Sequence, residues 1–205
     1  MRKYDVSAEQ QKLNEINKWS AKHTNTIGRE PQRLVHVSLI KQLFPNSKSI
    51  LCVGSRIDHE VATFRNNGFD AIGIDIAYES DLIKRIDAHE LMNHFEEGQF
   101  DIVYSSHSLE HMYDAELVLE NIKKVSKNGV FITLPCKSKL YKSHCSVFDL
   151  MVETEDESLF FDVGELSKRE DLLEDFKNLK PYELIFYKKR ETSPKKYEFD
   201  VVFRW

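Results

Sequence analysis

Residues 49–75 read SILCVGSRIDHEVATFRNNGFDAIGID, and the fold prediction depends on this stretch. The apolar run 49–53 ends at Gly54, which is typical of a buried strand followed by a tight turn. Residues 58–67 have the pattern of a helix. A second apolar strand is expected at 71–75. Strand, helix and strand in this order predict a parallel sheet with helices packed on it.

The same alternation continues to residue 134. We expect further strands at 82–86, 100–105 and 130–134, and helices near 88–96 and 114–127. Asn128 and Gly129 are expected to close the second of these helices. The end of the chain differs, because two strand-like runs follow with no helix fitting between them, at 182–189 and 197–205. The sequence therefore predicts an α/β fold with a mostly parallel, seven-stranded sheet, helices on both faces and an antiparallel C-terminal hairpin.

The domain organisation follows from the length and from the order of these segments. A chain of 205 residues favours one globular unit with a short appendage. Two helical patterns, at 8–22 and 30–44, precede the first strand, so we expect an N-terminal helical cap at 1–46 and the α/β domain at 47–205. Loops after the carboxyl ends of strands line the ligand crevice in open α/β sheets. We therefore expect the irregular stretch 137–180 to be an insertion on the substrate side.

The composition excludes several classes of partner. The formal net charge of −5 leaves no overall field that attracts nucleic acid, so we do not expect that partner. The three cysteines are odd in number and lack paired metal-site spacing, which favours reduced thiols. The charged N-terminus has no apolar run behind it, and no segment has the length of a membrane span. We expect a cytoplasmic protein that does not bind membranes.

Gly54 and Asp75 together predict a nucleoside site. A glycine after a buried strand lets the backbone pass close to a ligand. Asp75 ends the second strand about twenty residues later, where an acidic side chain accepts hydrogen bonds from ribose hydroxyls. A dinucleotide fold needs two more glycines in this loop, and Arg56 and Asp58 occupy it instead. A nucleoside cofactor without phosphate fits these residues better.

Four segments resemble, in order, the motifs of class I S-adenosylmethionine-dependent methyltransferases. GIDI at 73–76 is similar to the family's second motif, DAHEL at 87–91 to the motif after it, and GQFDIVYSSHSLEH at 98–111 to its fourth-strand motif. KKVSKNG at 123–129 resembles the turn before its fifth strand. The resemblance covers about residues 48–136, and the C-terminal hairpin extends it. It implies a Rossmann-like sheet, S-adenosylmethionine as cofactor and methyl transfer as the reaction.

The resemblance also implies roles for residues at the ends of the first two strands. Gly54, Ser55 and Arg56 would border the methionine and ribose parts of the cofactor. Asp75 would hold the ribose hydroxyls, and Ile76 would lie against the adenine.

Later motifs supply the other cofactor residues that the resemblance implies. Asp87 would accept a hydrogen bond from the adenine amino group, with Ala88 beside it. Ser105 and Ser106 would lie near the sulfonium. The first motif departs from the family, since Cys52 stands where an acidic residue is usual. A weakly active or inactive S-adenosylmethionine-binding domain is therefore the alternative to an enzyme.

Two histidines that follow predicted strands are the candidate bases. An oxygen acceptor of high pKa needs a base to remove its proton, and histidine is the usual choice. His107 lies just past the fourth strand and His144 follows the fifth. The chain is small and acidic and carries no added nucleic-acid or peptide-binding module. We therefore expect methylation of a hydroxyl on a small molecule or a sugar.

A zinc hydrolase is the less favoured alternative. His107 and His111 fit H-x-x-E-H, the inverted zinc-peptidase motif, with Glu110 as the base. That motif places both histidines on one face of a helix and needs a third ligand. Here the segment begins directly after an apolar strand, so we assign no metal site.

Overall fold

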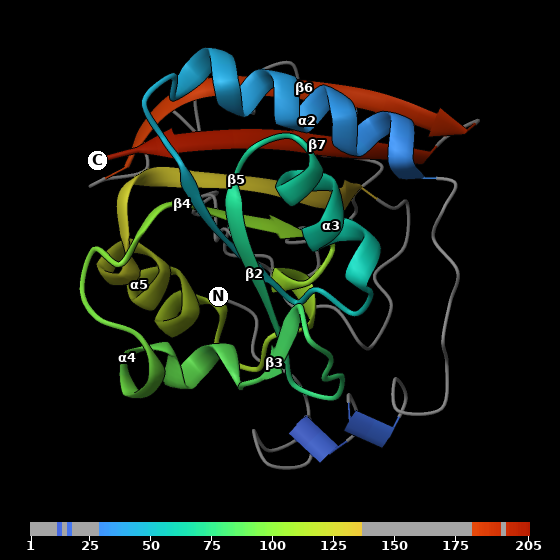
Figure 1. Ribbon diagram of the computed structural model, residues 1–205. Helices are drawn as coiled ribbons and strands as arrows, with labels where there is room; N and C mark the ends of the chain where they lie inside the picture. The colour runs from blue at the N-terminus through green and yellow to red at the C-terminus, as the bar shows by residue number, and fades with distance from the viewer. Residues whose placement is uncertain (1–11, 14–15, 18–28, 137–181, 194–195) are drawn as a thin grey trace, which may run out of the picture.

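The computed structural model describes residues 12–13, 16–17, 29–136, 182–193 and 196–205 (Figure 1). Residues 12–13 and 16–17 are helical, within the helix expected before the first strand. The later elements, in chain order, are α2 (Glu30–Leu43), β1 (Ser49–Val53), α3 (Asp58–Asn66), β2 (Asp70–Asp75), β3 (Ile83–Arg85), η2 (Ala88–Glu90), α4 (Leu91–His94), β4 (Phe100–Ser106), η3 (Leu109–His111), α5 (Ala115–Val125), β5 (Ser126–Cys136), β6 (Glu183–Ser193) and β7 (Lys196–Arg204).

The strands form one seven-stranded sheet in the order β3-β2-β1-β4-β5-β7-β6. The first five strands pair in parallel, and β7 pairs antiparallel with both β5 and β6. The order reverses direction at β1, between β2 and β4, and ligands bind at such a switch point in open α/β sheets. The predicted fold class is therefore confirmed, including the antiparallel hairpin at the end of the chain.

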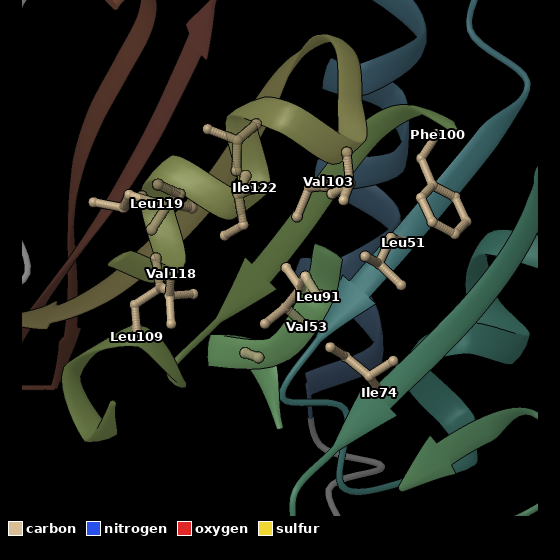
Figure 2. Packing of buried hydrophobic residues seen from close by; sticks show 14 of the residues in the cluster. Leu51, Val53, Ile74, Leu91, Phe100, Val103, Leu109, Val118, Leu119 and Ile122 are labelled. Atoms are coloured by element: carbon tan, nitrogen blue, oxygen red, sulfur yellow. The ribbon is translucent and has the colours of Figure 1, made fainter. Parts of the chain in front are cut away.

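Helices cover both faces of the sheet, and the alternation of strand residues explains why (Figure 1). In β1, Leu51 and Val53 pack toward α4 and α5, whereas Ile50 and Cys52 pack toward α2 and α3. Strands buried on both faces are apolar along their length, as residues 50–53 of β1 are. Figure 2 shows the first of these two layers, with side chains from the sheet meeting those of α4, η3 and α5.

The junction of α5 and β5 differs from the prediction. The helix was expected to continue to 127 and to be closed by Gly129, but it ends at Val125 and the strand begins at Ser126. The Ser126 hydroxyl explains this boundary, because it donates to the Gly129 carbonyl at 2.7 Å and accepts from its N–H at 3.2 Å. A Cβ at Gly129 would lie 2.1 Å from the Phe203 carbonyl oxygen. Glycine is needed here for a close strand contact and not for a helix end.

Two of the segments that the sequence predicts lie wholly or largely outside the residues that the structure describes. The insertion expected at 137–180 lies entirely outside the described residues, as does most of the helix expected at 8–22. Within the described ranges, none of the helices has the length and apolar character that crossing a bilayer requires.

Candidate active site

A cavity opens at the carboxyl-terminal edge of the parallel strands, where β1, β2 and β4 end. Its walls combine apolar side chains with two carboxylates, a composition that suits a nucleoside with an aromatic base and a ribose. We call it the nucleoside cavity. It is lined by Lys12, Gly54, Arg56, Ile74, Asp75, Ile76, Ile86, Asp87, Ala88, His89, His107, Ser108, His111, Met112 and Tyr113.

Gly54 determines how closely the chain passes this cavity. Its φ of 77° lies in the left-handed region, which costs other residues about 1–2 kcal/mol. A Cβ at this position would lie 2.2 Å from the Cβ of Ser108. The Ser108 hydroxyl donates to the Val53 carbonyl at 2.9 Å and so ties the segment after β4 to the end of β1. Both the backbone conformation and the space therefore require glycine.

Asp75 is the last residue of β2, and its carboxylate faces the nucleoside cavity with 6% of the residue exposed. Its Oδ1 accepts hydrogen bonds from the backbone N–H groups of Ala77 at 2.7 Å and Tyr78 at 2.9 Å. Burial raises the pKa of Asp75, while these two bonds and the charge of Arg56 partly oppose the rise. The carboxylate is thus held in one orientation as an acceptor at the strand end.

The carboxylate of Asp87 contacts both a histidine and a lysine. Its Oδ1 lies 2.6 Å from Nδ1 of His89, and its Oδ2 lies 2.8 Å from Nζ of Lys12. His89 Nε2 accepts from the Asp114 backbone N–H, so Nδ1 carries the proton and donates to Asp87. The His89 ring also stacks on Tyr113 at 3.5 Å. Burial opposes ionisation of Asp87, but the bonds from His89 and Lys12 outweigh it and hold its pKa well below the usual range.

A second cavity adjoins the first and shares Gly54, Arg56 and His107 with it. We call it the acceptor cavity. It is far more polar, because three arginines and one carboxylate face it. It is lined by Arg29, Gln32, Arg33, Gly54, Arg56, Ile57, Glu60, Tyr104, Ser106 and His107.

Glu60 places a carboxylate near Cys52, the position at which the resemblance predicts an acidic residue. The hydroxyl of Ser55 donates to Glu60 Oε1. Burial, followed by the charge of Glu60, raises the pKa of the Cys52 thiol. Glu60, from the first turn of α3, therefore lies within electrostatic reach of Cys52 and brings negative charge to this region from a different element.

His107 stands between the two cavities in an unusual backbone conformation. Its φ is 54°, which is uncommon for a residue with a side chain, and its N–H donates to the Thr133 carbonyl at 3.0 Å. Its Nε2 lies 3.0 Å from Oε1 of Glu198 on β7. Burial opposes ionisation of Glu198, but the hydrogen bond from His107 and the charges of Arg29 and Arg190 outweigh it and lower its pKa to about 2.

A second histidine and carboxylate lie beside the first pair. His36 of α2 is buried, with Nδ1 2.9 Å from the Tyr104 hydroxyl and Nε2 3.4 Å from Oδ1 of Asp200. Arg190 donates to Asp200 at 2.7 Å and to Glu198 at 2.9 Å, so one guanidinium bridges both carboxylates. Sequence reasoning did not single out any of these residues. The alternation of Glu198 and Asp200 along one strand was the available signal that they share a face.

The structure brings most of the predicted site residues together. Ser106 lines the acceptor cavity, whereas Ser105 lies on the opposite face of β4 with its hydroxyl 2.6 Å from that of Ser108. Ser55 is turned to Glu60 and lines neither of the two cavities. His144 lies outside the described residues. The other predicted residues all line the nucleoside cavity: Gly54, Arg56, Asp75, Ile76, Asp87, Ala88 and His107.

The geometry of residues 107–111 does not provide the helix that the zinc motif needs. His107 has a left-handed φ and precedes the three-residue 3₁₀ helix η3, so it and His111 do not lie one turn apart on an α-helix. His107 faces Glu198 instead. No cluster of three histidine, cysteine or acidic side chains with metal-ligand geometry occurs within the part of the chain that the structure describes.

Comparison with known families agrees with this arrangement. A sequence model described as a methyltransferase domain matches residues 23–187, which is most of the chain. The chain belongs to this methyltransferase family. It is an enzyme that uses S-adenosylmethionine as its methyl donor, and the departures in its first motif do not remove it from the family.

Solved structures show that the methyltransferase shares its fold with enzymes of very different sequence. A Burkholderia thailandensis 1,6-didemethyltoxoflavin-N1-methyltransferase, with S-adenosylhomocysteine bound, is 9% identical with a TM-score of 0.68 and covers 100% of this chain and 92% of its own. The magnesium protoporphyrin IX methyltransferase of Synechocystis is 10% identical, with a TM-score of 0.55 and coverages of 97% and 94%. No curated protein matches the sequence of this chain.

The nucleoside cavity fits the cofactor of this family. Its carboxylates at Asp75 and Asp87 are acceptors suited to ribose hydroxyls and to an adenine amino group. Ile76, Ile86 and Met112 provide apolar walls for the base. The left-handed turn at Gly54 lets the end of β1 pack directly against Ser108, another residue that lines the cavity.

Proposed function

We propose that the methyltransferase methylates a hydroxyl oxygen of a small molecule or a sugar, with His107 as the general base. One observation carries this proposal. His107 stands at the junction of the nucleoside and acceptor cavities and is backed at 3.0 Å by a carboxylate, Glu198. A histidine oriented by a carboxylate is an arrangement that removes protons from hydroxyl groups.

Four of the predicted residues that line the nucleoside cavity would hold the adenosine part of the cofactor. Asp75 receives the ribose hydroxyls, Asp87 the adenine amino group, and Ile76 and Ala88 the ring. The sulfonium supplies an electrophilic methyl group with a good leaving group when the cofactor is bound. The junction at Gly54 is then the place where donor and acceptor meet.

Residues of the acceptor cavity next to Gly54 have the charges that an amino-acid moiety requires. Glu60 offers a carboxylate for the ammonium group of the methionine end, in place of the acidic residue missing at Cys52. Arg33, which is 4% exposed, offers a guanidinium for its carboxylate. Ser106 borders the same cavity on the side of β4.

His107 has a defined route for the proton. Its Nε2 lies 3.0 Å from Oε1 of Glu198, and a proton held on Nε2 beside this carboxylate leaves a lone pair on Nδ1 of the neutral ring. Nδ1 accepts the hydroxyl proton as the oxygen takes the methyl group, and Glu198 stabilises the imidazolium that forms. Gln32 and Arg190 orient Glu198 through bonds of 3.2 and 2.9 Å. A hydroxyl of high pKa needs this help, and this need is our reason for favouring oxygen as the acceptor atom.

The size and chemical class of the acceptor form a separate part of the proposal. The fold is shared with enzymes named for a toxoflavin precursor and a porphyrin, so it does not choose the acceptor. The N-terminal domain of EvdMO1, crystallised with S-adenosylhomocysteine and D-fucose, has a TM-score of 0.51 at 16% identity, with coverages of 84% and 82%.

We retain the division into a helical cap at 1–46 and a main domain at 47–205. Residues Arg29, Gln32 and Arg33 of that cap line the acceptor cavity.

A direct test is methylation of a panel of hydroxylated small molecules and sugars by the purified full chain. Formation of S-adenosylhomocysteine, together with mass spectrometry of the acceptor, reports transfer and its position. We expect an O-methyl product whose formation depends on His107. Methylation of nitrogen or carbon acceptors only would contradict the proposal. Tight cofactor binding without transfer to any acceptor would favour the inactive binding domain.

A further inference from the structure

A lysine from the N-terminal part of the chain reaches into the nucleoside cavity. Lys12 lines this cavity, and its Nζ lies 2.8 Å from Oδ2 of Asp87. The Lys12 side chain is 36% exposed, whereas that of Asp87 is 5% exposed. The hydrogen bond to Asp87 raises the pKa of Lys12 and outweighs the opposing effect of burial, so Nζ is an ammonium at neutral pH. The contact joins a partly exposed cation to a buried carboxylate inside the proposed cofactor site.

Both oxygens of Asp87 are occupied in this arrangement. Oδ1 accepts from the backbone N–H of His89 at 3.1 Å and lies 2.6 Å from Nδ1 of the same residue. Each carboxylate oxygen offers about two lone pairs, so these two donors use those of Oδ1. Oδ2 is buried, with the Lys12 ammonium against it. While Lys12 stays at Oδ2, an adenine amino group cannot reach this carboxylate.

The Lys12 ammonium and an adenine amino group offer Asp87 the same kind of contact, because each is a nitrogen that carries N–H donors. A buried carboxylate without a donor is costly, so Asp87 needs such a partner whichever group provides it. Lys12 provides it in this structure, and the amino group can provide it to the same oxygen. The two donors therefore exclude each other.

We infer that Lys12 is an internal competitor of the cofactor, whose ammonium occupies the acceptor of the adenine amino group and leaves it when adenosine binds. This inference rests on the proposed function, since the role of Asp87 toward adenine belongs to that proposal. An ion pair with one partly exposed partner contributes little free energy. The competition consequently lowers the affinity for the cofactor without blocking the site.

Calorimetric titration of adenosine and of S-adenosylhomocysteine into the full chain tests the competition. Lys12→Met removes the competing donor, so the Kd of both ligands should fall about three- to tenfold. Salt screens a partly exposed ion pair. Higher ionic strength should therefore tighten adenosine binding by the unmodified protein more than by Lys12→Met.

Lys84→Met is the matched control, because Lys84 is an exposed lysine of β3 that lines neither cavity. Its Kd values should equal those of the unmodified protein. A Kd that is unchanged or higher in Lys12→Met would overturn the inference.

Acetylation of Lys12 by acetic anhydride gives a second measurement, which needs no variant. The reagent modifies the neutral amine, and the bond to Asp87 keeps Lys12 protonated. Saturation with adenosine should release the side chain and raise its rate of acetylation severalfold relative to that of the exposed Lys48, as measured by mass spectrometry. An unchanged or lower rate would mean that Lys12 stays at Asp87 or binds the nucleoside itself, and the inference would be wrong.

Adding Asp87→Asn to Lys12→Met separates the inference from the proposed function, because it measures the contribution of Asp87 without the competitor. The double variant should bind adenosine at least about tenfold more weakly than Lys12→Met does. Equal Kd values would overturn the role proposed for Asp87. Weaker binding by the double variant, without tighter binding by Lys12→Met, would overturn the inference alone. Hydroxyl methylation in the acceptor panel tests the proposed reaction independently of both results.

Discussion

His107 Nε2 and Glu198 Oε1 lie 3.0 Å apart although their residues belong to distant parts of the chain. His107 follows β4, Glu198 is on β7, and β5 lies between these strands in the sheet. The pair forms because the hairpin folds back antiparallel along β5 and brings its acidic residues toward the carboxyl ends of the parallel strands. The last strand of the fold thereby contributes directly to the proposed catalytic centre.

His107→Gln should lower turnover of an O-methylated acceptor by about 10²–10⁴-fold, the usual contribution of a general base. Glu198→Gln should lower it less, by about tenfold or more, since it removes only the group that orients the imidazole. The affinity for S-adenosylhomocysteine, measured by calorimetry, should change little in either variant.

His94→Gln provides the matched control for that pair of variants, because His94 is an exposed histidine at the end of α4. Its turnover should equal that of the unmodified protein. If His107→Gln retained full turnover, or if it lost cofactor affinity and activity together, the assignment of His107 as base would fail.

Asp75→Asn should weaken S-adenosylhomocysteine binding by about 10–100-fold, because the ribose hydroxyls lose a charged acceptor. Asp70→Asn removes the same charge from the exposed start of the same strand, β2, and should leave Kd unchanged. Calorimetric titration of S-adenosylhomocysteine into each variant measures the two Kd values. Equal Kd values for both would remove Asp75 from the cofactor site.

Gly54→Ala should destabilise the protein by several kcal/mol, because it combines a left-handed backbone with overlap against Ser108. Gly68 also has a positive φ, of 90°, but nothing lies within 4 Å of a Cβ placed there. Gly68→Ala should therefore cost only about 1 kcal/mol. Urea unfolding measures both costs. Adding Ser108→Gly to Gly54→Ala should recover part of the loss, and no recovery would contradict the proposed contact.

The carboxylates of β7 make stability depend on pH in the acid range. Glu198 has a pKa of about 2, below its ordinary 4.5, and Asp200 has one of about 2, below 3.8. A lowered native pKa stabilises the fold above the unfolded-state value, and that stability is lost as the pH falls toward the native value. We expect the free energy of unfolding to fall between about pH 4.5 and pH 2. For Glu198 alone the loss is roughly 2–4 kcal/mol.

Urea unfolding over this pH range, repeated with Glu198→Gln, tests the expectation. The variant should be less stable at neutral pH and show a shallower dependence below pH 4.5. Arg190→Met should also be destabilised near pH 7, because its guanidinium bridges Glu198 and Asp200. Lys188→Met is the control, because Lys188 is an exposed residue of β6, the strand that also carries Arg190. This variant should be as stable as the unmodified protein. If the free energy of unfolding of Glu198→Gln fell with decreasing pH as steeply as that of the unmodified protein, the expected contribution of Glu198 would be wrong.

Much of the nucleoside cavity was predictable because it is built from strand ends. Gly54 and Asp75 each follow an apolar run, and parallel strands bring their carboxyl ends to one edge. The two serines at the end of β4 were harder to interpret. Successive residues of a strand point to opposite faces, so Ser106 reaches the acceptor cavity while Ser105 turns toward Ser108.

The strand and helix pattern, together with the ordered motifs, was sufficient for the fold, the cofactor and the residues at the edge of the sheet. These features are local, since each depends on an apolar run and the residue that ends it. The partners of His107 and His36 depend instead on how β7 pairs with β5 and how α2 crosses the sheet. Pairing register between distant segments is set by packing and hydrogen bonding in three dimensions, which no local pattern contains. For that reason the tertiary structure alone identified Glu198, Asp200 and Arg190 as the residues behind the site.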